Sequence, residues 1–250
     1  MTPPRPSGPG PLADLRNRTP ARVALGHSGT GLPTAALLNF QLDYARARDA
    51  VHESLDLQGL AAQLEGSEVI RVHSQAADRT TYLQRPDLGR RLAPQCHDAL
   101  PPGPYDVAFI LGDGLSAHAL QLHAAPTLRL ILPALIGWRV APVIIATQAR
   151  VALGDDIGSR LSAAFSVVLI GERPGLSAPY SLGAYLTWKP TPGRRDHERN
   201  CISNIRPPQG LAYEEAAARL VWLLHAARRA GRSGFLLKDD SAILQSDCSP

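Results

Sequence analysis

Short apolar runs alternate with longer amphipathic stretches over the C-terminal half of the chain. The runs at residues 107–111, 143–146 and 167–170 contain only apolar residues, which is typical of buried strands. Residues 116–132 and 152–165 between them have the length and apolar spacing of helices. Because strands that alternate with helices form parallel pairs with helical crossovers, the pattern predicts an α/β fold with a Rossmann-like, mostly parallel sheet.

The N-terminal half has a different pattern. Apolar residues at intervals of three and four predict an amphipathic helix over residues 37–55, and a short strand is expected at residues 69–72 within mostly helical surroundings. The sequence PPGP at residues 101–104 then breaks the chain. We therefore expect a Pro/Gly-rich flexible head at residues 1–18, a smaller, mainly helical domain at residues 19–104, and the Rossmann-like domain at residues 105–250.

The last predicted helix, over residues 214–229, has charges that suit its dipole. Glu214 and Glu215 fall in its first turn and Arg228 and Arg229 in its last, and Gly231 is placed to end it.

Three loops follow the predicted parallel strands and should meet at one edge of the sheet. Asp113, Val151 and Glu172 lie in these loops, and open α/β sheets bind ligands outside the carboxyl ends of their strands. Cys201 lies in a polar stretch expected to be a loop after a strand at residues 185–188. It joins the same edge if that strand is parallel, which the sequence leaves open.

Composition excludes several classes of protein. The hydrophobic content is 44% and no apolar run reaches the roughly 18 residues of a membrane span, and the N-terminus lacks the apolar core of a secretory signal. The net charge is +4, but basic residues are interspersed with acidic ones, which predicts solvated faces and no nucleic-acid partner. Three cysteines, Cys96, Cys201 and Cys248, form no CxxC pair, which suits a reducing cytoplasm; the sequence indicates no role for Cys96 or Cys248.

The sequence GDGLSA, from Gly112 to Ala117, has the spacing of a dinucleotide-binding loop between a strand and a helix. The acidic residue that would hold a ribose about twenty positions later is missing, since no Asp or Glu occurs between Asp113 and Asp155. A tight turn for close packing is the favoured interpretation. A free-standing nucleotide-binding α/β enzyme that uses Gly112–Ala117 remains the alternative function.

Cys201, Glu172 and nearby groups allow other chemistry. Cys201 with His197, and Glu172 or Glu198, contains the residue types of a thiol nucleophile with its base, but no nucleophile elbow surrounds it. Cys201 and His197 supply two ligands where a structural zinc site needs four, so no metal site is predicted. Glu172, between a strand end and Arg173, can accept hydrogen bonds from a polar ligand or form an ion pair with an arginine.

Four stretches of the chain resemble a known family in the same order. They are residues 19–52, residues 78–92 with DRTTYLQRPDLGRRL, residues 106–125 with GDGLSA, and residues 167–207 with GERPGLSAPYSLGAY and DHERNCISNIRP. The chain thereby resembles, over residues 15–239, the small (light) subunit of ethanolamine ammonia-lyase, an adenosylcobalamin-dependent enzyme.

The resemblance implies a function and a site. It implies a radical reaction that converts ethanolamine to acetaldehyde and ammonia, begun by homolysis of the cobalt–carbon bond, in a complex whose catalytic barrel belongs to a large subunit. It implies that Val151, Glu172 and Cys201 contact cobalamin and that this chain holds no catalytic residue. The cofactor is expected base-on, in agreement with the absence of an Asp-x-His-x-x-Gly motif. It also implies six large and six small subunits, in the cytoplasm or within an ethanolamine-utilisation microcompartment where the host makes one.

Overall fold

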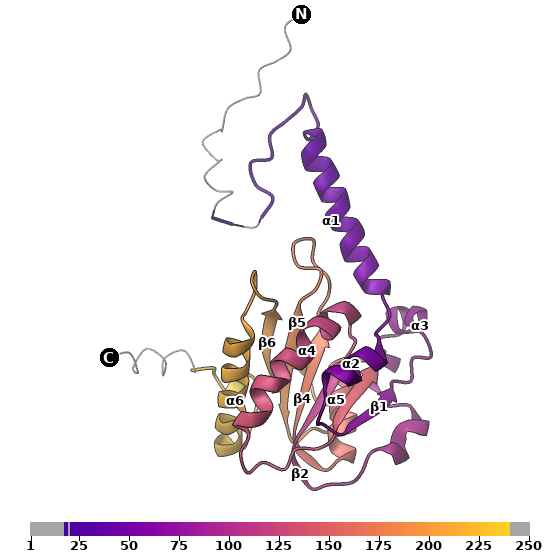
Figure 1. The fold of residues 1–250 in the computed structure, drawn as a ribbon, viewed down its shortest axis with the longest axis vertical. Helices are drawn as coiled ribbons and strands as arrows, with labels where there is room; N and C mark the ends of the chain where they lie inside the picture. The colour runs from indigo at the N-terminus through magenta and orange to yellow at the C-terminus, as the bar shows by residue number, and fades with distance from the viewer. Residues whose placement is uncertain (1–17, 20, 241–250) are drawn as a thin grey trace, which may run out of the picture.

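The computed structural model describes residues 18, 19 and 21–240 as a layered α/β body from which one helix projects (Figure 1). The head predicted at residues 1–18 and Cys248 fall almost entirely outside these described residues. The strands are β1 (Val69–His73), β2 (Tyr105–Gly112), β3 (Val143–Thr147), β4 (Ala163–Gly171), β5 (Leu182–Trp188) and β6 (Arg199–Ile205). The α-helices are α1 (Thr34–His52), α2 (Leu57–Gln63), α3 (Arg79–Gln84), α4 (Ala117–Ile131), α5 (Leu153–Arg160) and α6 (Tyr213–Ala230). Short 3₁₀-helices are η2 (Leu88–Arg90), η3 (Pro94–Ala99), η4 (Leu132–Ala134), η5 (Asp196–Glu198) and η6 (Gly234–Leu236).

The six strands form one mixed sheet in the order β1-β3-β2-β4-β5-β6. The four strands from β1 to β4 are parallel, whereas β5 is antiparallel to β4 and β6 is antiparallel to β5. The α/β class is therefore confirmed, and the sheet is mixed because β5 and β6 are antiparallel; its Rossmann-like character stays a prediction. The physical reason for the antiparallel pairing is that residues 172–181 and 189–198 contain no crossover helix, and strands joined by short loops pair antiparallel.

Two apolar layers cover the two faces of the sheet. On the first face, α2, α4 and α6 pack on β2, β4, β5 and β6 through residues such as Phe109, Leu128 and Leu224. On the second face, α5 and η3, with Leu92 and Ala93 before η3, pack on β1 to β4. Among the described residues, the second layer includes no fully buried residue of β5 or β6. Thr187 and Arg199 on this face are buried, and Arg199 bonds Asp155 of α5, whereas Cys201 and Ser203 farther along β6 are exposed.

Most predicted elements are present, with shifted ends. The helix expected at residues 152–165 ends at Arg160, because Leu161 and Ser162 form a turn in which Ser162 has a φ of 52°. The following strand begins earlier than expected, at Ala163. The last helix has the expected acidic first turn and basic last turn, and Gly231 ends it with a φ of 63°, a left-handed conformation that suits glycine.

The strand expected at residues 69–72 is present as β1, at one edge of the sheet. β1 lies before the domain boundary predicted near residue 104, yet all five of its residues pair with β3, which follows that boundary. The sheet therefore draws strands from both sides of the predicted division, and the mainly helical N-terminal domain remains a prediction.

The N-terminal helix is present as α1, but it leaves the body at its C-terminal end and projects away from it (Figure 1). Its only buried residue is Ala50. Among the described residues, no helix is long and apolar enough to cross a membrane.

Candidate functional site

The carboxyl ends of β2, β3 and β4 lie side by side at one edge of the sheet. Ala146 of β3 pairs with Gly112 of β2, which pairs with Ile170 of β4. The loops that carry Asp113, Val151 and Glu172 leave the sheet directly after these residues. The sequence prediction that the three loops share one edge is thus consistent with the register.

Glu172 is fixed by hydrogen bonds to β6 and to the loop that precedes β5. Its Oε2 accepts from Ser181 Oγ at 2.7 Å and from the Asn204 amide at 3.1 Å, and its Oε1 accepts from Ser203 Oγ. Among the described residues it forms no ion pair, so the alternative of an ion pair with Arg173 is wrong. A carboxylate offers about four acceptor positions, and three donors leave room for one more from outside.

Gly183 makes space for this carboxylate. A Cβ atom at Gly183 would lie 2.9 Å from Glu172 Oε1 and 3.1 Å from the Tyr185 ring. Real Cβ atoms essentially never approach another atom at 2.9 Å. A side chain at this position of the SLGAY sequence would therefore require the Glu172 carboxylate to shift.

Cys201 lies within β6 and not in the expected loop. It lies near Glu172 because of the direction of β6, and not because β5 is parallel. β5 is antiparallel, and β6 then returns towards the edge where Glu172 lies. Ser203, two residues after Cys201, therefore lies on the same face of the strand and contacts Glu172. The thiol is on an exposed residue of that face.

Tyr185 lies between Glu172 and Cys201, and the sequence analysis did not select it. It pairs with Cys201 across β5 and β6. Burial raises the pKa of Tyr185 above its ordinary value, and Cys201 raises it further. The alternation of side chains along β5 could have identified Tyr185, because residues two apart in a strand lie on the same face, and Tyr185 follows Gly183 by two.

Cys201 is held as a thiol at neutral pH. Burial of the sulfur by its neighbours raises the pKa of Cys201, while the Tyr185 hydroxyl lowers it and the Glu172 charge raises it. A nucleophilic cysteine needs a lowered pKa or an adjacent base. His197 instead packs its ring against Phe235, and Glu198 bonds Arg194 and the Arg195 amide. The thiol-hydrolase interpretation therefore finds no support.

Val151 lies beside the same face, in the turn before α5. Farther along α5, Gly154 packs against Val168, Val168 pairs with Tyr185, and Tyr185 pairs with Cys201. Val151 and Tyr185 both pack against the apolar layer of the second face. Glu172, Tyr185, Cys201 and Ser203 lie together on this face, and Val151 borders the same apolar layer. We call these five residues the open face.

The GDGLSA loop is occupied by its own contacts. The Asp113 carboxylate accepts from the Gln148 and Ala149 amides, both at 2.9 Å, and its pKa is raised by burial. The Leu115 amide donates to Gly171 O at 3.0 Å, and Gly114 has a φ of 56°. The loop's polar groups, among them the Leu115 amide, are thus already hydrogen-bonded within the protein and not free to bind a pyrophosphate. This favours the tight turn over the dinucleotide site.

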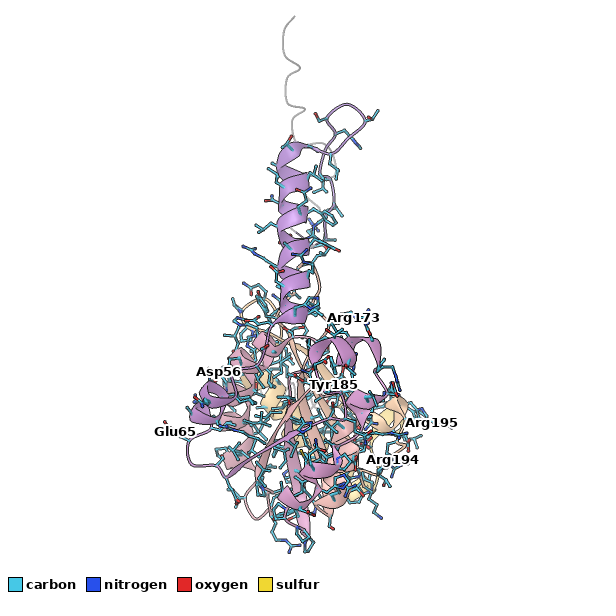
Figure 2. The ribbon with its side chains drawn as sticks, turned by 90° about the vertical axis from the view of Figure 1, so that its right-hand side faces the viewer. Asp56, Glu65, Arg173, Tyr185, Arg194 and Arg195 are labelled. Carbon is cyan, nitrogen blue, oxygen red and sulfur yellow. The ribbon has the colours of Figure 1, made fainter. Side chains whose placement is uncertain are left out.

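A separate cavity of about 680 Å³ lies over the outer side of α5. Its lining includes Arg90, Arg160, Arg194 and Arg195 together with Ala152, but neither Glu172 nor Cys201. In Figure 2, Arg194 and Arg195 lie at the rim of the body, away from Tyr185. Cys201 and Ser203 of the open face lie at the surface of the body, where both are exposed. Among the described residues, no group of three or more His, Cys, Asp and Glu side chains is placed to hold a metal ion.

Comparison with known proteins gives consistent matches over nearly the whole chain. Residues 9–238 match the family model described as ethanolamine ammonia-lyase light chain (EutC). The ethanolamine ammonia-lyase small subunit of Bradyrhizobium diazoefficiens is 52% identical over 93% of this chain and 92% of its own length. Those of Pseudomonas syringae pv. tomato and Rhodopseudomonas palustris are 49% and 51% identical, over 96% and 93% of this chain and 87% and 91% of their own lengths.

Proposed function

The chain belongs to the ethanolamine ammonia-lyase light-chain family, and we propose that its open face holds adenosylcobalamin against the catalytic large subunit. The observation that carries this proposal is the exposed part of the second face at Cys201 and Ser203, where Glu172 keeps one acceptor position free. A surface of this kind needs a second surface to enclose a ligand, as a small subunit of a complex would require.

The residues of the open face fit the chemistry of a corrin. Cobalamin is a broad, flat macrocycle that carries amide side chains. Glu172 supplies a charged acceptor for an amide N–H, and Val151 and Tyr185 supply apolar surface beside it. Because the Cys201 pKa is raised, Cys201 contacts the cofactor as a neutral thiol, which behaves as a small hydrophobic group. When bound, the cofactor supplies the adenosyl radical that starts the conversion of ethanolamine to acetaldehyde and ammonia.

This chain's own part in the reaction is binding and orientation. Glu172 is fixed by three internal donors before any ligand arrives, so its position costs little further ordering. No residue of this chain acts as a catalytic group, and the chain is inactive alone. The cofactor binds base-on, so the protein need not supply a cobalt ligand. The catalytic barrel belongs to the large subunit, because the single open sheet described above is not a closed eight-stranded barrel.

The complex is proposed to contain six large and six small subunits. We place it in the cytoplasm, or within an ethanolamine-utilisation microcompartment where the host makes one.

The test is co-purification with the large subunit of the same organism, followed by a visible spectrum and an acetaldehyde assay with adenosylcobalamin and ethanolamine. We expect activity only when both chains are present. Glu172→Gln should raise the Kd for cobalamin about tenfold or more, since a hydrogen bond to a charged acceptor contributes about 1.5–3 kcal/mol.

Glu65→Gln is the matched control, because Glu65 is exposed and lies far from the open face in Figure 2. Both variants should assemble with the large subunit as the unsubstituted chain does. Unchanged cobalamin affinity in Glu172→Gln would remove Glu172 from the cofactor site, and activity of the large subunit alone would remove the need for this chain.

A further inference from the structure

Helix α1 presents large apolar side chains to solvent. Leu37, Leu38, Leu42 and Tyr44 are 42%, 57%, 48% and 58% exposed. Figures 1 and 2 both show the helix standing clear of the body for most of its length. Exposed apolar surface of this extent marks an interaction site.

The exposed apolar residues lie on two opposite sides of the helix. At 3.6 residues per turn, Leu37 and Tyr44 fall on one side, which the segment before α1 covers only in part: Arg22 pairs with Asp43 at 2.6 Å and lies over the Phe40 ring. Leu38 and Leu42 fall on the other side. A partner that buries both sides must surround the helix, as a groove does.

A second copy of α1 does not meet this requirement. The seam Leu37, Phe40, Tyr44, Ala47 and Val51 follows a heptad pattern, but it spans two heptads, where a coiled coil is sustained over three or four. A pair of helices joined at this seam would also leave Leu38 and Leu42 in water. The two Asp and two Arg residues of α1 give it no net charge with neutral His52, so the attraction to its partner is apolar.

The base of α1 lies at the same end of the body as Glu172. His118 of α4 connects the two: its Nδ1 lies 3.3 Å from Glu53 Oε1, directly after α1, and its ring centroid lies 4.5 Å from that of Tyr180. Tyr180 belongs to the loop of residues 172–181. The residue after Tyr180, Ser181, donates a hydrogen bond to Glu172. A subunit that covers the open face at this edge therefore also meets the base of α1.

We propose that α1 is an anchoring arm that inserts into an apolar groove of the large subunit, next to the surface that closes over the cofactor. A helix of 19 residues extends about 28 Å at 1.5 Å per residue, so the arm reaches well beyond the open face. The identity of the partner rests on the proposed function. The need for a surrounding apolar partner rests on the exposure of α1 alone.

The experiment compares Leu38→Glu/Leu42→Glu with Asn39→Glu/Arg46→Gln. Both double variants change the net charge by −2, but the second alters only the polar side of α1. The Kd for the large subunit is measured by sedimentation, without cobalamin. We expect Leu38→Glu/Leu42→Glu to raise this Kd at least tenfold, from the lost burial of two leucines, and the control to change it less than threefold. Circular dichroism should show that both variants keep the fold, because all four residues are exposed.

The outcomes separate this inference from the proposed function. Acetaldehyde production at saturating large subunit should be normal in Leu38→Glu/Leu42→Glu, because α1 does not touch the cofactor site. If the complex of unsubstituted chains is inactive, the proposed function is contradicted. If the variants still show the expected Kd changes, the arm remains supported. An unchanged Kd in Leu38→Glu/Leu42→Glu would overturn the proposed arm. The arm would also be overturned if this variant abolished self-association of the small chain but still bound the large subunit.

Discussion

His123 is a buried histidine that joins three parts of the body. Its Nε2 lies 3.1 Å from the Tyr180 carbonyl and its Nδ1 lies 2.8 Å from the Tyr213 hydroxyl. Because a carbonyl only accepts, Nε2 carries the proton of the neutral ring, and Nδ1 accepts from the tyrosine. Burial lowers the pKa of His123, and the nearby His118 and Arg206 lower it further.

This lowered pKa predicts a loss of stability in acid. A group whose folded-state pKa is depressed contributes stability above its unfolded pKa, here 6.5, and loses it as the pH falls through the folded value. The free energy of unfolding should therefore fall below about pH 6.5 more steeply in the unsubstituted chain than in His123→Gln. Urea titrations from pH 5 to 8 measure it, with His52→Gln as an exposed control. A difference between the chains that stays constant with pH would contradict the prediction.

Single residues of the site were partly accessible from the sequence. Glu172 followed from its position after a strand, and Cys201 and Val151 from family resemblance. Tyr185 was missed because it stands in an apolar run and carries no motif of its own. The donors to Glu172 come from residues 181, 203 and 204, and their approach depends on strand pairing that no local pattern specifies.

Between elements, a buried ion pair connects α5 to β6. Arg199 donates to Asp155 through Nη1 at 2.6 Å and Nη2 at 2.7 Å, and the two side chains are 2% and 1% exposed. Arg199 also donates to Thr187 Oγ1 at 2.9 Å. The pair fixes α5, the helix that follows Val151, to the strand that carries Cys201.

Asp155→Asn should therefore destabilise the fold strongly, because it leaves the Arg199 charge buried without a counter-charge. Removing one partner of a buried pair costs about 3–5 kcal/mol. Asp87→Asn is the control, since the Asp87 pair with Arg85 is exposed and such pairs contribute about 0–1 kcal/mol. Urea denaturation of both variants gives the comparison. Equal, small losses would show that the buried pair does not tie α5 to β6.

Helices and parallel strands were predictable because their apolar period is local. The direction of β5 and the strand character of residues 199–205 were not, since β6 mixes polar residues on its open face with apolar residues on the other. Alternation of this kind resembles a polar loop until the partner strand is known. The sequence also did not predict that α1 projects from the body. Its apolar spacing is that of a helix packed on a core, but α1 buries only Ala50 against the body.

At the scale of the whole molecule, β1 decides how the chain divides. It occupies one edge of the sheet and pairs along its full length with β3, and Val72, Leu92 and Cys96 from the N-terminal side of residue 104 belong to the second apolar layer. α1, by contrast, buries only Ala50. The contacts therefore favour a folding unit that begins after α1 over one that begins at residue 105.

Two truncated chains test this division. Residues 54–250 should unfold cooperatively with a Tm close to that of the full chain, because they retain the whole sheet and both apolar layers. Residues 105–250 should show no cooperative transition, because β3 becomes an unpaired edge and the second apolar layer loses its covering residues to water. Thermal scans by near-ultraviolet circular dichroism distinguish the two chains. A sharp transition in residues 105–250 would show that the C-terminal domain predicted from the sequence is an independent unit and that β1 is an accessory strand added to its edge.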